Sequence, residues 1–116
     1  MIIGKHFEFE ASHKLPDKAI YGACSKLHGH TYKLTVEVEG EITPFGWVMN
    51  FKELKEVINR KVISAFDHNY INDIIAIPTA ENMLVWIKEQ IEPELSTKLK
   101  SLTLYETSNS YAKLIC

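Results

Sequence analysis

The sequence predicts an α+β domain, in which an antiparallel sheet carries two helices packed on one face. Two stretches in the first third of the chain alternate apolar and polar residues, which is the period of a half-buried strand. Two later stretches repeat apolar residues at helical spacing, and each follows a residue that commonly caps a helix. Elements in the order strand, strand, strand, helix, helix, strand favour helices segregated to one face of an antiparallel sheet.

The strands are predicted from alternation and from the turns that bound them. The first strand is predicted at residues 2–11 and the second at residues 31–39, where the alternation is clearest. A short apolar strand is predicted at residues 47–49, after a turn that contains proline and glycine. The last strand is predicted at residues 101–106, and residues 111–115 can extend it.

Each helix is predicted from a cap and an apolar stripe. The first begins after Asn50, a capping residue that Glu53 follows three positions later. The second begins after Thr79, which follows Pro78. The apolar stripe of the first helix is Phe51, Leu54, Ile58 and Val62, and that of the second is Ala80, Met83, Leu84, Ile87 and Ile91.

Length, charge and cysteine content limit the classes of function. The 116 residues carry a net charge of −2 and their Lys and Arg residues are scattered, so no nucleic-acid partner is expected. No linker or repeat divides the chain, which predicts one domain over residues 1–116. Cys24 and Cys116 lie far apart, which favours a reduced cytoplasmic protein, and no signal peptide or membrane span is expected. A domain this small exposes much apolar surface, so we expect a homo-oligomer.

Three histidines are candidate metal ligands. In His28-Gly29-His30, the spacing of an extended chain directs both imidazoles to the same side, and the glycine adds no bulk between them. An antiparallel sheet can bring His13, at the end of the first strand, beside the start of the second. Three neutral imidazoles leave one position of a tetrahedral Zn²⁺ open, which is the arrangement of a catalytic site.

Two alternatives to a catalytic zinc site stay open at the level of sequence. A His-x-His pair on a strand is commonly exposed and binds no metal. The spacing of Cys24 and His28 also fits a structural zinc site, in which the thiolate is a fourth ligand beside the three imidazoles. If Cys24 is an unligated loop residue near a dication, it is accessible, has a lowered pKa and can move a proton.

Asp67-His68 and Glu106 are further candidates. An adjacent carboxylate and imidazole can tune a proton carrier near neutral pH, although most such dipeptides are surface groups. Glu106 ends the last predicted strand, where its carboxylate can accept two parallel N–H donors, such as those of a pterin or guanine. The alternative for Glu106 is a solvated glutamate at a strand end.

These motifs occur together in the order of a known enzyme family. The sequence resembles the 6-pyruvoyltetrahydropterin synthase family, which includes the 6-carboxytetrahydropterin synthases of queuosine biosynthesis. The resemblance implies a T-fold of four antiparallel strands and two helices, and a homohexamer formed from two trimers. Asn50 and Trp47 depart from the family's pattern, which commonly has aspartate and a smaller residue there. The motifs are Phe7-x-Phe9-x-Ala11-x-His13, Cys24-x-x-x-His28-Gly29-His30-x-Tyr32, Gly46 to Phe51, Asp67-His68, Pro78 to Asn82, and Glu106-Thr107.

The resemblance also implies an activity. The implied reaction converts 7,8-dihydroneopterin triphosphate to 6-carboxy-5,6,7,8-tetrahydropterin with release of acetaldehyde and triphosphate, and the three residues between Cys24 and His28 favour this branch. The alternatives are a 6-pyruvoyltetrahydropterin synthase, which eliminates triphosphate, and a noncatalytic zinc-stabilised binding module. The implied roles are zinc binding by His13, His28 and His30, catalysis by Cys24, Asp67 and His68, and pterin binding by Glu106 and Thr107.

Overall fold

The computed structural model describes residues 1–116. Its strands are β1 (Ile2–His13), β2 (His28–Glu39), β3 (Lys98–Thr107) and β4 (Ser110–Ile115). Its α-helices are α1 (Lys18–Tyr21), α2 (Phe51–Ile58), α3 (Ser64–Phe66) and α4 (Ala80–Ile91). A π-helical turn, Asn59–Ile63, joins α2 to α3, and 3-10 turns lie at Gly22–Ser25, Ile71–Asp73 and Glu92–Glu94.

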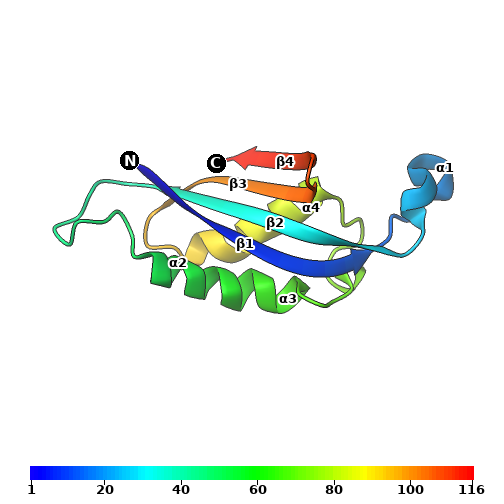
Figure 1. Cartoon of the computed structure of the whole chain (residues 1–116), viewed down its shortest axis with the longest axis horizontal. Coiled ribbons are helices and arrows are strands. Elements are labelled where there is room, and N and C mark those ends of the chain that lie inside the picture. Colours follow the sequence, from blue (N-terminus) through cyan, green and yellow to red (C-terminus); the bar gives the residue numbers. More distant parts are fainter.

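The four strands form one antiparallel sheet in the order β1-β2-β3-β4. Figure 1 shows the long helices α2 and α4 on the same side of this sheet, whereas the short α1 stands on the β1–β2 connection and projects from one end. The predicted α+β class, with four antiparallel strands and two helices on one face, is confirmed. None of the helices combines the length and apolar character that crossing a membrane requires.

The core lies between the sheet and the helices because the apolar positions of β1 and β2 all face that way. Phe7 stands opposite Leu34 and Phe9 opposite Tyr32 in the antiparallel register. The rings of Phe9 and Tyr32 stack with their centroids 5.0 Å apart. Since side chains alternate faces along a strand, every second residue beyond these pairs also points toward the helices. The row of core-facing side chains along β1 and β2, called here the core stripe, therefore continues to the ends of both strands.

The first long helix begins where predicted but has a different stripe. The side chain of Asn50 accepts a hydrogen bond from the backbone N–H of Lys52 at 2.9 Å, so the predicted cap is confirmed. Phe51, the first residue of α2, was expected to be buried in the apolar stripe but is 51% exposed. Val57 is buried instead. In α4 the side chain of Thr79 caps the helix as predicted.

Two strand predictions are corrected. Residues 47–49 form no strand, because the hydroxyl and N–H of Thr43 both donate to the carbonyl of Trp47 and close a turn. Val48 and Met49 are nevertheless buried, which explains their apolar character. Residues 111–115 do not lengthen β3 but belong to β4, which turns back and pairs with β3. As a separate strand, β4 forms backbone hydrogen bonds with β3. One long strand that extended beyond the core would leave those N–H and C=O groups without protein partners.

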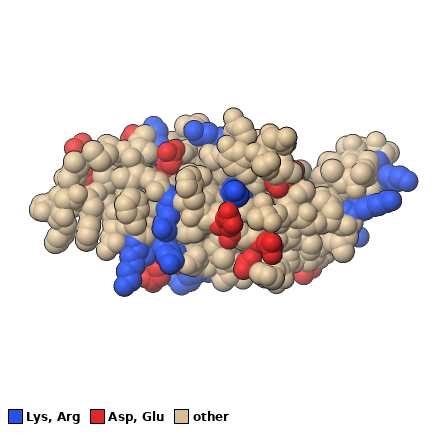
Figure 2. Space-filling model, viewed as in Figure 1, with Lys and Arg blue, Asp and Glu red and all other residues tan.

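Charges of both signs lie intermingled on the face of the molecule shown in Figure 2. Several lysines also lie on the projecting end that carries α1. The lysines of this connection, Lys14, Lys18 and Lys26, are exposed.

Candidate metal centre

The candidate metal centre lies at the end of the core stripe, where three strands replace apolar side chains with polar ones. On β1 the stripe ends in Ala11 and His13, and on β2 it ends in His30 and His28. The antiparallel register places His13 directly opposite His28, and Ala11 opposite His30. The small side chain of Ala11 leaves room beside the larger ring of His30. The predicted convergence of these histidines thus follows from the pairing of β1 with β2.

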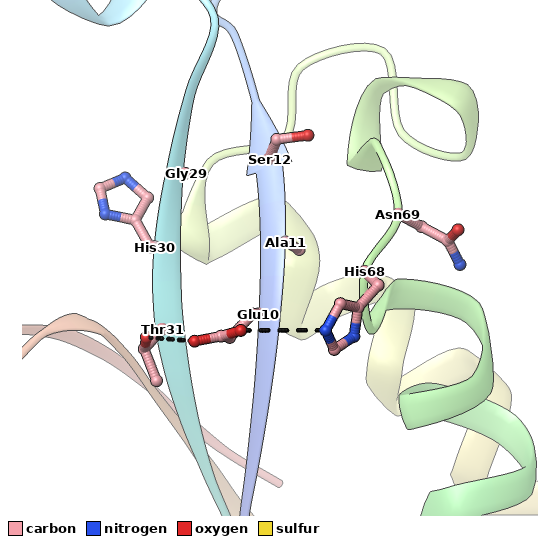
Figure 3. A pocket seen from close by; sticks show the side chains of 8 residues that line it. All are labelled: Glu10, Ala11, Ser12, Gly29, His30, Thr31, His68 and Asn69. Carbon is pink, nitrogen blue, oxygen red and sulfur yellow. Dashed lines mark hydrogen bonds and ion pairs between the residues drawn. The ribbon is translucent and has the colours of Figure 1, made fainter.

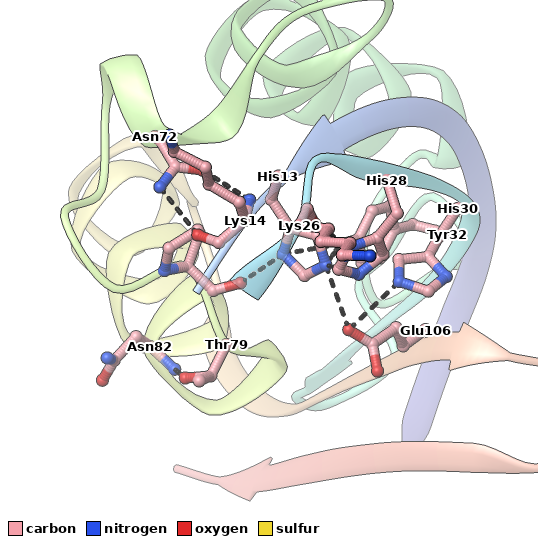
Figure 4. Close-up of polar contacts among 11 residues, drawn as sticks. His13, Lys14, Lys26, His28, His30, Tyr32, Asn72, Thr79, Asn82 and Glu106 are labelled. Atoms are coloured by element: carbon pink, nitrogen blue, oxygen red, sulfur yellow. Dashed lines mark hydrogen bonds and ion pairs between the residues drawn. The ribbon is translucent and has the colours of Figure 1, made fainter. Parts of the chain in front are cut away.

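Hydrogen bonds to backbone carbonyls fix which ring nitrogen of two histidines is free. His13 Nδ1 lies 2.7 Å from the Pro78 carbonyl oxygen, and His28 Nδ1 lies 2.7 Å from the Lys26 carbonyl oxygen. A carbonyl can only accept, so both Nδ1 atoms carry a proton, and in the neutral form of each ring Nε2 presents a lone pair. These Nε2 atoms lie 3.0 Å apart. Figure 4 shows the imidazoles turned toward one another and toward Glu106.

His30 and Glu106 complete the cluster. The Nε2 atom of His30 is buried and has no hydrogen-bond partner. Glu106 Oε1 lies 3.5 Å from Nε2 of His30 and 3.5 Å from Nε2 of His13. Glu106 continues the core-facing positions of β3 at the point where a β-bulge shifts the register toward β4, and bulges commonly redirect side chains at such edges.

The residues present fit a divalent transition metal such as Zn²⁺. One nitrogen from each of His13, His28 and His30 lies within 4.8 Å of the others. Two nitrogens bound to one tetrahedral Zn²⁺ lie about 3.3 Å apart, which is close to the observed separation of His13 and His28. Two lone pairs at 3.0 Å repel one another unless a proton or cation lies between them. A shared cation would remove that repulsion and also give the buried nitrogen of His30 a partner.

The electrostatics favour the neutral ligand form of His13 and His30. Burial lowers the pKa of His13 below its usual value, which outweighs the opposing hydrogen bond to Pro78. Burial likewise lowers the pKa of His30, against the opposing charge of Glu106. Burial raises the pKa of Tyr32, whose hydroxyl lies 3.4 Å from His13 Nδ1, and the nearby Glu106 carboxylate adds to the rise. Tyr32 therefore stays protonated and adds no charge to the cluster.

Cys24 lies outside this cluster. It is exposed in the 3-10 turn Gly22–Ser25, on the projecting connection between β1 and β2. Its thiol is not among the ligand atoms that converge, which come from His13, His28 and His30 alone. The carbonyl of Cys24 accepts a hydrogen bond from the N–H of Leu15 at 2.8 Å, which closes the base of the connection. The arrangement favours three imidazole ligands over a four-ligand site that includes this thiol.

Asp67 and His68 lie at the free edge of β1. Asp67 Oδ1 accepts a hydrogen bond from the N–H of Glu10 at 3.0 Å and lies 3.1 Å from His68 Nδ1. The hydrogen bond from Glu10 is the main reason that the pKa of Asp67 is lowered. His68 has a backbone φ of 58°, in the left-handed region, and its Nε2 lies 3.9 Å from Glu10 Oε2. Figure 3 shows this ring at a hollow of about 450 Å³ that Ser12 and Thr31 also line.

The region around Glu106 contains a second, smaller hollow. It has a volume of about 230 Å³, and Glu106 and Glu81 both line it. Thr107, which the sequence associates with pterin binding, is exposed and donates a hydrogen bond from its hydroxyl to Asn109 Oδ1 at 3.0 Å. The structure thus gathers the three histidines and Glu106 in one place, and it sets Cys24, Thr107 and His68 apart from them.

Sequence reasoning missed the groups that orient the imidazoles. The carbonyls of Pro78 and Lys26 have no side-chain signature, because any residue has a carbonyl. The position of Tyr32 beside the imidazoles could have been predicted, because it lies two residues after His30 on the same face of β2.

Comparison with known proteins decides the family. A family model described as 6-pyruvoyl tetrahydropterin synthase matches residues 2–115 of the chain. The chain belongs to the 6-pyruvoyl tetrahydropterin synthase family. The resemblance that the motifs indicated is therefore confirmed. Membership of this family makes the chain a pterin-processing lyase with a three-histidine candidate metal centre.

Individual members of the 6-pyruvoyl tetrahydropterin synthase family carry different activities in their names. The 6-carboxy-5,6,7,8-tetrahydropterin synthase of Synechocystis is 35% identical over 119 residues, which cover 97% of this chain and 91% of the relative. A dihydroneopterin monophosphate aldolase of Pyrococcus furiosus is 47% identical over 83 residues, covering 70% of this chain and 71% of the relative. The structure of a Caenorhabditis elegans 6-pyruvoyl tetrahydropterin synthase has the same fold, with a TM-score of 0.92 at 23% identity over 100% of this chain and 95% of that one.

Proposed function

We propose that the chain is a zinc-dependent lyase that converts 7,8-dihydroneopterin triphosphate to 6-carboxy-5,6,7,8-tetrahydropterin, releasing acetaldehyde and triphosphate. The observation that carries this proposal is the convergence of three imidazole nitrogens beside the carboxylate of Glu106. Three protein ligands leave a position for substrate, which is the arrangement of catalytic zinc. The Synechocystis relative and the spacing of Cys24 and His28 support the carboxy product.

The metal would polarise the side-chain oxygens of the pterin substrate as a Lewis acid when it is held by His13, His28 and His30. Glu106 would bind the ring, because a carboxylate beside the metal site can accept the parallel N–H donors of a pterin. Glu106 also lines a hollow of about 230 Å³ that would form part of the place for this ring.

Cys24 and His68 are the proposed proton carriers. The thiol of Cys24 is exposed and free, so it is accessible for proton transfer. The ring of His68 is oriented by Asp67, whose carboxylate is itself held by the backbone of β1. An imidazole oriented by an ionised carboxylate suits proton transfer near neutral pH.

A second copy of the chain would bring these groups together, in the proposed hexamer of two trimers. Both ionic contacts of His68 are with Asp67 and Glu10, and neither is with an imidazole of the metal centre. The hollow beside Glu106 is also smaller than the roughly 300 Å³ at which ligand pockets usually begin. Mixing a Cys24→Ala chain with a His68→Ala chain should restore activity if the two residues act from different copies, and no restoration would contradict that arrangement.

Aldol cleavage of a dihydroneopterin phosphate is a second candidate, favoured by the Pyrococcus relative at 47% identity. Cleavage between the first two side-chain carbons would leave a hydroxymethyl pterin and release a phosphorylated two-carbon aldehyde. The pyruvoyl route, for which the matched family model is named, would instead retain all side-chain carbons and release triphosphate.

Product identification tests the proposal. The zinc-loaded protein is incubated with 7,8-dihydroneopterin triphosphate, and separately with the monophosphate, and the products are identified by mass spectrometry. Acetaldehyde with triphosphate supports the carboxy reaction. A pyruvoyl pterin would instead identify the pyruvoyl reaction, and a phosphorylated two-carbon aldehyde would identify aldol cleavage. No consumption of either substrate would favour a noncatalytic zinc-stabilised module. Cys116→Ala is the matched control for Cys24→Ala, because Cys116 is the other free cysteine and should be dispensable.

A further inference from the structure

The orientation of His13 depends on a short turn that is distant in sequence. The carbonyl that accepts its Nδ1 proton belongs to Pro78, which lies just before α4, and both residues are buried. If this carbonyl moved or rotated, Nδ1 would lose its acceptor and the ring would no longer be held with Nε2 toward His28. The turn around Pro78 is therefore part of the metal centre, although it supplies no ligand.

Pro78 cannot anchor this turn through its own N–H, because proline has none. The residues on its two sides are held by Asn82 instead. The side-chain amide of Asn82 donates to the carbonyl of Ile77 at 2.8 Å, and its backbone N–H donates to the hydroxyl of Thr79 at 3.2 Å. The N–H of Thr79 donates to the same Ile77 carbonyl at 2.9 Å. Figure 4 shows Asn82 and Thr79 side by side at the start of α4.

The amide of Asn82 is not needed to start the helix. Thr79 already supplies the cap, and Asn82 is an exposed residue in the first turn of α4. At such a position an acidic side chain would stabilise the helix better, because it complements the positive end of the helix dipole. Aspartate has the same shape as asparagine, but it lacks the side-chain N–H group that donates to the carbonyl of Ile77.

We propose that Asn82 is a positioning residue for metal binding. Its side-chain amide fixes the turn from Ile77 to Thr79, so that the Pro78 carbonyl holds His13 in the form with a proton on Nδ1 and a free Nε2. The metal-binding part of this inference rests on the proposed function, whereas the orientation of the His13 ring does not.

The substitution Asn82→Asp separates this role from a structural one. Aspartate keeps the shape and the backbone bond to Thr79, but its carboxylate cannot donate to the Ile77 carbonyl. Groups that orient a metal-binding histidine typically change metal affinity about 10- to 100-fold when they are lost. We expect zinc affinity, measured by competition with a chromophoric chelator, to fall by about that factor, while the thermal unfolding midpoint of the metal-free protein stays the same or rises.

Two control variants make the result specific. Asn59→Asp adds the same charge at an exposed asparagine that makes no side-chain hydrogen bond, and it should leave zinc affinity unchanged. Thr79→Ala removes the helix cap but leaves the bond from Asn82 to Ile77, so it should lower the unfolding midpoint more than the zinc affinity. Equal losses of zinc affinity in Thr79→Ala and Asn82→Asp would overturn the proposal, because general loosening of the helix start would then explain both.

A measurement without metal distinguishes failure of this inference from failure of the proposed function. In the zinc-free protein, long-range ¹H–¹⁵N correlation spectra report which ring nitrogen of His13 carries the proton. We expect the Nδ1 form in the unsubstituted chain and a mixture of both forms in Asn82→Asp. An unchanged ring in Asn82→Asp refutes the positioning role. A changed ring in a protein that binds no zinc would instead refute only the metal centre.

Discussion

Replacing Glu106 with glutamine separates the substrate site from the metal site. The carboxylate lies 3.5 Å from Nε2 of both His13 and His30, so it is placed to influence both the metal and a bound ring. Glutamine preserves the shape but removes the charge and replaces one acceptor oxygen with an N–H₂ donor. That donor would face the N–H groups of the pterin ring and repel them.

The two expected effects differ in size. A hydrogen bond to a charged group contributes about 1.5 to 3 kcal/mol, so pterin affinity should fall about 10- to 150-fold. Because the side chain is 33% exposed, solvent screens its charge and the lower end of that range applies. The carboxylate acts on the metal only as a neighbouring charge, and partly exposed charge pairs contribute up to about 1 kcal/mol, or about fivefold in zinc affinity.

Two titrations measure these effects on the same protein. Binding of 7,8-dihydroneopterin to the zinc-loaded chain is followed by fluorescence, and zinc binding is followed by chelator competition. Glu89→Gln is the matched control, because Glu89 is an exposed glutamate of α4 that does not line this hollow. Equal losses of pterin and zinc affinity would identify Glu106 as a metal ligand, and unchanged pterin affinity would remove it from the substrate site.

Three further predictions concern the ligands, the thiol and pH. His28→Ala should reduce bound zinc well below one ion per chain by elemental analysis, and unchanged stoichiometry would contradict its role as a ligand. Cys24→Ala should keep its zinc and lose turnover, whereas loss of zinc together with the thiol would support the four-ligand structural site. Burial lowers the native pKa of His13 and His30 below 6.5, so the unfolded chain binds more protons than the native one as pH falls. The unfolding midpoint of the zinc-free protein should therefore drop between about pH 7.5 and 5.5; a flat profile would show that these rings are not buried as neutral groups.

Most of the fold could be predicted because its elements have strong local signals. The alternation in β1 and β2 and the caps Asn50 and Thr79 each predicted an element that the structure contains. The predictions failed where buried residues lie outside helices and strands. Val48 and Met49 are apolar because they pack on the core from a loop, and no local rule distinguishes such residues from a short strand.

The break between β3 and β4 was missed for a related reason. Asn109 and its neighbours are typical turn residues, but the apolar alternation resumes after them and was interpreted as one continuing strand. The antiparallel pairing of β3 with β4, for example of Tyr105 with Tyr111, shows that the chain reverses there. A hairpin is defined by contacts between residues on its two arms, which a pattern along one arm does not contain.

The sequence by itself determined which side chains are available for chemistry. His28 and His30 share a face because an extended chain alternates, and this holds before any tertiary contact forms. The tertiary structure decided how those side chains are held. Pairing of β1 with β2 set His13 opposite His28, and the docking of α4 brought the Pro78 carbonyl to the ring of His13 across 65 residues of sequence. Such contacts depend on backbone groups that every residue has, so only the folded chain specifies them.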